Sequence, residues 1–382
     1  MLLPAFSTVR TPSHGEPPFK PIDWLPLMDV RDLVADLVFI VRSPVDGVEP
    51  AINESARLSG AWLKIATVFR ALNNVLALPR GYRRELVSIA SSYFIAGSDP
   101  SITFLALVNK YEALLRRWLD WSREALTTVI VVAIMIGVAS FLTILGSPPM
   151  ISLIGIALVP FIHYYQVELV RYDYVKPTIA GLIGGSTAYL IGHYLMGLVG
   201  SRLVFAIIMG SCTAFAIAYI PQFIGFVKNY LGMPQRVLNS FGELLTLGNP
   251  QPPKPLTIIE KELRPLWDYA YGAGDREFVE RVIIVVNSLI DFVRDSVRVG
   301  LIYGPFTAVG YVFMLFTAYV LTGIHAMAIT GVPITLNPQL ITQALIPMAV
   351  ATSILVGESM HSIGLGISLL PILLMPLIPL IW

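Results

Sequence analysis

Two stretches of this chain place a charged amphipathic helix directly before an apolar stretch long enough to cross a bilayer. Residues 275–298 repeat apolar side chains at helical spacing and carry charges on the remaining faces, and residues 299–321 then carry no charge. Residues 100–124 and 125–145 repeat this construction. The pattern predicts a membrane protein built twice on one plan, in which a helix outside the membrane continues into a membrane helix.

The other apolar stretches raise the expected number of membrane helices to about seven. They are expected at residues 125–145, 150–165, 177–199, 203–227, 299–321, 339–357 and 363–382. The second stretch is at the lower length limit for spanning, so a tilted or partly interfacial helix remains an alternative there.

Two charged regions lie outside these spans, and both have a helical pattern. Residues 30–124 fit several amphipathic helices separated by Gly and Pro, and residues 228–298 fit a second set. Residues 1–29 are rich in proline and are expected to form an extended or disordered lead-in. We therefore expect an all-α polytopic membrane protein with two cytoplasmic helical-bundle regions. The first region precedes the membrane helices within residues 125–227, and the second precedes those within residues 299–382.

Similar turns precede the two long helices. Ala96 and Gly97 come before the first, and Ala273, Gly274 and Asp275 come before the second. This likeness of pattern favours an internal duplication.

Composition and charge placement indicate the orientation. The chain is 55% hydrophobic and 13% charged, well below the roughly 25% charge of a soluble domain. Of its 26 lysines and arginines, 14 precede residue 125 and nine lie in 228–298, whereas Arg202 alone falls on the opposite side of a seven-span path. The positive-inside rule then places the N-terminus and both charged regions in the cytoplasm, and the C-terminus outside a cell membrane.

Signatures of chemistry are missing from the sequence. Residues 299–357 contain no Asp, Glu, Lys or Arg, and the chain has no P-loop, no zinc-protease motif and no nucleophile elbow. Its one cysteine, Cys212, excludes a multi-cysteine metal site. We therefore predict a protein that is not an enzyme, with no catalytic, cofactor-binding or metal-binding residues and no nucleic-acid partner.

Two sets of residues are candidates for contacts. Gly181 and Gly185 fit a close helix–helix approach, either within the chain or at a homodimer seam. The charged residues of the long amphipathic helices are candidates for docking a partner protein, and those predicted are Arg116, Arg117, Glu277, Glu280 and Arg281.

The layout resembles the type II secretion F-domain family, the membrane platform proteins of type IV pili, secretion systems and archaella. It is closest to the archaeal and tight-adherence branch. Three stretches carry the likeness, namely residues 32–52 (DLVADLVFIVRSPVDGVEPAI), residues 86–105, and residues 353–374 (SILVGESMHSIGLGISLLPILL).

This resemblance implies a non-enzymatic scaffold that couples a hexameric cytoplasmic ATPase to pilin or pilin-like subunits in the membrane, with a homodimer as the expected state. A transporter or channel for an apolar or lipid-linked substrate is the alternative, and it would need a continuous cavity among the spans.

Overall fold

The computed structural model describes residues 29–144, 156–160, 162, 173–246, 250–252, 254–327 and 338–378. The α-helices within these ranges are α2 (Val30–Asp46), α3 (Val48–Leu58), α4 (Gly60–Leu72), α5 (Tyr82–Ile95), α6 (Pro100–Ile144), α8 (Val175–Leu190), α9 (Ser201–Thr246), α10 (Ile258–Glu262), α11 (Arg264–Ala273), α12 (Arg276–Tyr303), α13 (Val309–Met327), α14 (Pro338–Ser359) and α15 (Ile363–Leu374). The prediction of an all-helical protein is confirmed.

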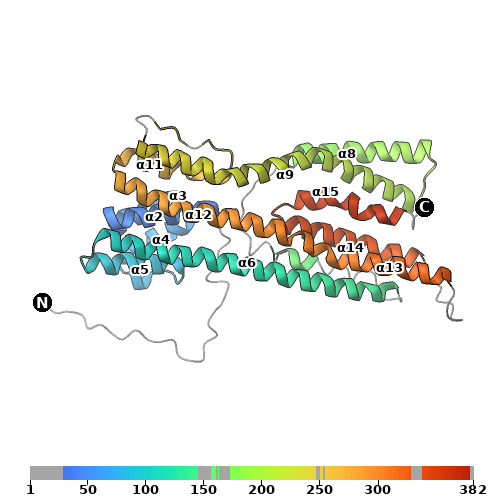
Figure 1. Ribbon diagram of the computed structural model, residues 1–382, viewed down its shortest axis with the longest axis horizontal. Coiled ribbons are helices and arrows are strands. Elements are labelled where there is room, and N and C mark those ends of the chain that lie inside the picture. Colours follow the sequence, from blue (N-terminus) through green and yellow to red (C-terminus); the bar gives the residue numbers. More distant parts are fainter. Residues whose placement is uncertain are drawn as a thin grey trace, which may run out of the picture.

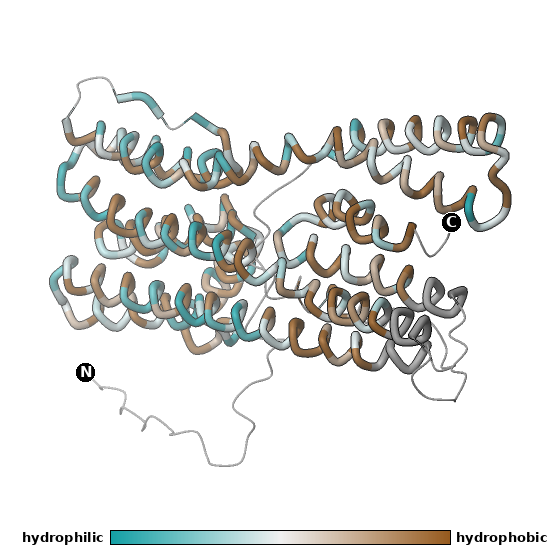
Figure 2. The backbone as a smooth tube through the Cα atoms, turned by 45° about the vertical axis from the view of Figure 1, so that its right-hand side comes forward, coloured by the Kyte–Doolittle hydropathy of each residue, from teal (hydrophilic) through white to brown (hydrophobic). Residues whose placement is uncertain are grey.

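The molecule is elongated, and its two ends differ in polarity. Helices α6, α9 and α12 run along the long axis, with α2, α5 and α11 at one end and α8, α13, α14 and α15 at the other (Figure 1). Hydrophilic segments concentrate at the end that holds α2–α5 and α11 (Figure 2). We call that end the bundle and the opposite end the apolar half.

Among the described residues, three helical segments are long and apolar enough to cross a membrane. They are Pro100–Val138, Ser201–Thr246 and Arg276–Thr317, and the shorter apolar helices Leu345–Ser359 and Ile363–Leu377 accompany them. The predicted span at residues 150–165 lies mostly outside the described residues.

The helices differ from the expected pattern at two places. Helix α9 continues without a break from the apolar half into the bundle, so residue 228, where charge resumes, is not a helix end. The segment expected to form one helix over 275–321 is instead interrupted by a 3-10 turn at Pro305–Ala308. Pro305 causes this interruption because proline has no backbone N–H to donate to the preceding turn.

The two charged regions pack against each other around a single apolar core. Phe39 and Leu86 from the first region share this core with Val286 and Trp267 from the second. Polar contacts also join the regions, because Arg31 pairs with Glu262 at 3.1 Å and the Tyr269 hydroxyl donates to Asp46 at 3.0 Å. The bundle is therefore one packed unit assembled from both regions.

Small residues allow close approach of helices in the apolar half. A Cβ on Gly181 would lie 3.3 Å from the Ser211 carbonyl oxygen, and one on Gly185 would overlap the Ser211 side chain. The predicted glycine face of α8 is thus filled by α9 of the same chain. Helices α14 and α15 approach equally closely, since a Cβ on Gly357 would lie 2.6 Å from the Gly366 nitrogen.

Candidate functional site: the paired helices α6 and α12

Helices α6 and α12 lie side by side and run in the same direction. Arg281 of α12 donates to the Ser101 hydroxyl of α6 at 3.2 Å, and two turns later the Ser288 hydroxyl donates to Glu112 at 2.8 Å. The sequence separation falls from 180 to 176 between these pairs, a shift of about one helical turn, and the second value describes the register further along the helices. At that register Arg123 of α6 is level with Arg298 of α12. Charge therefore ends at the same height on both helices.

Both helices begin with the same kind of turn. Gly97 and Gly274 adopt left-handed backbone angles, with φ of 67° and 63°; Gly97 lies two residues after the end of α5, and Gly274 directly follows α11. Asp99 then accepts the Ser101 N–H at 2.8 Å, and Asp275 accepts the Glu277 N–H at 3.2 Å. These caps satisfy otherwise unpaired N–H groups, and the Ser101 N–H lowers the pKa of Asp99. The similar turns expected from the sequence thus have similar geometry.

Three of the predicted docking residues lie at the start of α12. Glu277 and Glu280 are exposed, and Glu280 pairs with Arg276 at 3.0 Å. Arg281 differs from them, because its side chain is only 13% exposed. Its guanidinium pairs with Glu277, donates to Ser101 and lies over the Phe104 ring, 5.7 Å from the centroid. Arg281 therefore joins α12 to α6, which the sequence pattern alone did not indicate.

The other two predicted docking residues lie further along α6. Arg116 is 81% exposed and its nearest carboxylate, Glu112, is 3.7 Å away. Arg117 is exposed beside it. Arg116 is level with Asp291 on α12, about 15 Å from Arg281 along the helix axis at about 1.5 Å per residue. The five residues thus form two separate groups, one at the far end of the bundle and one closer to the apolar half.

A groove of about 270 Å³ lies between α6 and α12 next to Arg116. It is lined by Glu112, Leu115, Arg116, Leu119, Asn287, Ser288, Asp291, Phe292 and Asp295. Of these residues the sequence predicted only Arg116 as a contact residue. The others were missed because a groove between parallel helices depends on their register, which periodicity along one helix does not specify.

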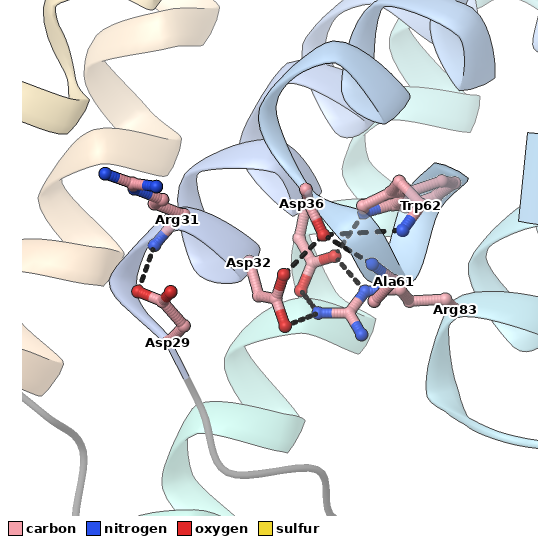
Figure 3. Close-up of polar contacts among 8 residues, drawn as sticks. Asp29, Arg31, Asp32, Asp36, Ala61, Trp62 and Arg83 are labelled. Carbon is pink, nitrogen blue, oxygen red and sulfur yellow. Dashed lines mark hydrogen bonds and ion pairs between the residues drawn. The ribbon is translucent and has the colours of Figure 1, made fainter. Parts of the chain in front are cut away.

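The first part of the bundle contains a buried polar cluster, in which Asp32, Asp36, Trp62 and Arg83 converge (Figure 3). Asp36 is almost fully buried and accepts from Trp62 Nε1 at 2.7 Å and from Arg83 Nε at 2.8 Å. Arg83 also lies 3.6 Å from Asp32, which accepts the Ser59 hydroxyl. Burial raises the pKa of the Asp36 carboxyl, and the charge of Arg83 opposes this rise. The cluster holds α2, α4 and α5 in one arrangement.

A second polar cluster lies where the bundle meets the apolar half. The turn between α14 and α15 packs against α12, so a Cβ on Gly300 would lie 2.8 Å from the Ser359 carbonyl oxygen. In this turn His361 approaches the Ser296 carbonyl oxygen at 3.5 Å, and burial lowers the pKa of His361 to about 4. The Tyr219 and Ser362 hydroxyls are hydrogen-bonded at 2.5 Å, which joins α9 to the same turn.

No protein-family model, curated protein or solved structure matches this chain. Helices α6 and α12 lie side by side, with exposed charges at one end and apolar segments at the other.

Proposed function

We propose that this chain is a non-enzymatic membrane platform of a type IV pilus-like filament or secretion machine, of the archaeal kind. In this role it couples a hexameric cytoplasmic ATPase to pilin or pilin-like subunits in the membrane. The observation that carries the proposal is the continuity of α6 and α9 from the charged bundle into the apolar half. A partner that moves the bundle would move the membrane helices with it, because no flexible linker separates them.

The proposed topology has seven spans, a cytoplasmic N-terminus and an external C-terminus. This topology is supported by the positions of the last charged residues of α6 and α12, Glu124 and Arg298, which lie at about the same level along the two helices. Such a common height is expected at a flat bilayer surface, where the basic side favours the cytoplasm. The bundle, with both charged regions, would then lie below that surface.

An internal duplication is part of the same proposal. Helices α5 and α11 each end at a left-handed glycine, and α6 and α12 each begin at an aspartate cap and run parallel. Two copies of a helix–turn–helix unit would give this arrangement. The parallel helices α6 and α12 would also present two similar N-terminal ends to a symmetric partner. A homodimer would present four such ends.

Within the alternative, a transporter or channel for an apolar or lipid-linked substrate, helix α13 does not favour an ion-coupled carrier. Residues 309–327 of α13 contain no Asp, Glu, Lys or Arg, whereas proton and ion pathways generally use such groups at membrane depth. In the described apolar half the buried carboxylate Glu358 lies beside the turn that faces the bundle. That position is near one surface of the proposed membrane and away from its middle.

Deletion of the gene tests the proposal. Loss of one class of surface filament, or of one secreted set of proteins, is expected, with recovery on complementation by the full chain. Normal filaments and secretion in the deletion strain would reject the platform function. Purified protein in liposomes provides the second measurement, because flux of an apolar or lipid-linked substrate would instead identify a transporter.

A further inference from the structure

We propose that the groove between α6 and α12 receives a basic segment of a partner protein, which inserts one lysine or arginine side chain between the two helices. The inference rests on the proposed function for the existence of a protein partner outside the membrane and for the position of the membrane surface. The groove's preference for a cation comes from its own residues.

The volume and the apolar walls of the groove favour a single long side chain as its occupant. Leu115, Leu119 and Phe292 give it apolar walls. Its volume of about 270 Å³ is below the roughly 300–1,000 Å³ of small-molecule pockets. A lysine or arginine suits this shape because its aliphatic stem packs on apolar surface while its charged head reaches polar groups.

The charge of the groove is complementary to such a side chain. Three carboxylates line it, from Glu112, Asp291 and Asp295, against one lining arginine, Arg116, and the aspartates are paired with Arg294 and Arg298, which do not line the groove. Arg116 points largely into solvent, with 81% of its side chain exposed, and its contact with Glu112 is long at 3.7 Å. A second cation can therefore enter without displacing a buried ion pair.

The ion pairs along α12 leave the aspartates able to accept further hydrogen bonds. Asp291 pairs with Arg294 at 2.8 Å, and Asp295 has only long contacts of 3.7 Å with Arg294 and Arg298. An ionised carboxylate has two oxygens and about four lone-pair directions. Glu112 is held in place by the Ser288 hydroxyl at 2.8 Å. Its carboxylate is therefore pre-positioned at the edge of the groove.

The groove also lies close to the proposed membrane surface. Leu119 is one helical turn before Arg123, and Asp295 is one turn before Arg298. A segment that follows a partner's membrane helix into the cytoplasm would meet the groove within its first turns. The expected occupant is thus a basic segment close to a membrane helix of another protein.

Photo-crosslinking in the native cell tests this inference. The full chain carries p-benzoylphenylalanine in place of Asn287, and the crosslinked peptides are sequenced by mass spectrometry. We expect a peptide of another protein with a lysine or arginine within a few residues of the crosslink. The double variant Asp291→Asn with Asp295→Asn should lower the crosslink yield at least fivefold. Asp268→Asn, an exposed aspartate on α11 that pairs with Arg264, is the matched control and should leave the yield unchanged.

Several outcomes would overturn the inference. They are a crosslink to lipid, a crosslink to a second copy of this chain, a crosslinked peptide without a basic residue, no crosslink, or an unchanged yield in the double variant. Thermal unfolding of the purified variants checks that folding is retained. A crosslink to a basic segment of a protein unrelated to filaments or secretion would support the groove assignment and reject the platform function, so the two failures are distinguishable.

Discussion

Gly310 of α13 lies against Gly137 of α6 so closely that a Cβ on Gly137 would come 2.5 Å from the Gly310 carbonyl oxygen. A Cβ on Gly310 would in turn overlap the backbone of α6 at Ala133. Replacement of Gly310 by alanine should therefore separate the two helices and destabilise the protein by about 1–3 kcal/mol, the usual cost of overpacking. The apparent Tm of the detergent-solubilised protein measures this.

Gly225→Ala is the control for this substitution. Gly225 is also inside a helix, α9, but a Cβ there meets no atom within 4 Å. Its replacement should leave the Tm unchanged or raise it slightly, since alanine favours a helix by about 1 kcal/mol over glycine. Equal Tm values for the Gly310→Ala variant and the parent protein would show that α6 and α13 are further apart than described.

The buried Asp36–Arg83 pair predicts a large effect of removing one partner. Arg83→Met leaves Asp36 buried without its countercharge and should cost about 3–5 kcal/mol. Replacement of both residues by apolar ones, Asp36→Leu with Arg83→Met, should cost less than the single change. Urea unfolding of each variant gives the comparison, and Arg276→Ala, in an exposed pair, should change stability by less than about 0.5 kcal/mol.

The buried His361 predicts a loss of stability in mild acid. Its folded pKa of about 4 is below the usual 6.5, so between these values the unfolded state binds more protons than the folded state. The stability that depends on neutral His361 is fully present above pH 6.5 and falls by about 2 kcal/mol at pH 5. Asn tolerates the left-handed backbone at this position, where φ is 59°, and does not titrate. His361→Asn should therefore flatten the dependence of Tm on pH between 7 and 5, and an unchanged slope would assign that dependence to other groups.

The proposed orientation predicts which positions can be labelled from outside the cell. In a Cys212→Ala background, a cysteine at Ser201 should react with a membrane-impermeant maleimide in intact cells, because Ser201 begins α9 at the far end of the apolar half. A cysteine at the exposed Arg117 should react only after the membrane is opened. The reverse labelling pattern would invert the topology and remove the ATPase from reach of the bundle.

The exposed acids at the start of α12 should matter to function more than to stability. Glu277→Lys with Glu280→Lys reverses charge at the far end of the bundle, and filament number in the complemented deletion strain should fall at least tenfold. The Tm should change by no more than a few degrees, because both glutamates are exposed and Arg281, the covered partner of Glu277, keeps its hydrogen bond to Ser101. The corresponding reversal at Asp268 is the control. A filament number equal to the parent's would remove these residues as docking candidates.

Local patterns in the sequence predicted several elements well. Several helices were expected within residues 30–124, where the structure has them, and the turns at Gly97 and Gly274 were expected to precede the long helices. These features depend on neighbouring residues only, through apolar spacing, a left-handed glycine and an aspartate cap. Sequence was therefore sufficient for the class of the fold.

Features that depend on packing between distant segments were not predicted. The charge that resumes at Lys228 indicated a helix boundary, although charge marks a change of environment and does not interrupt backbone hydrogen bonding, so α9 continues. Asp36 lies within an apolar stripe and gave no sign of its pairing with Arg83 on another helix. The groove and the covered position of Arg281 likewise require the register between α6 and α12.

That register has a mechanical consequence. The pair is fastened at Arg281 and Ser101 and again at Ser288 and Glu112, and beyond the 3-10 turn α13 contacts α6 where Gly310 meets Gly137. Two rods joined at several points along their length cannot shear past one another, so they flex as a single beam that is stiffer than either alone. A movement of the bundle would then tilt the two helices together, and little of the displacement would be lost along their length.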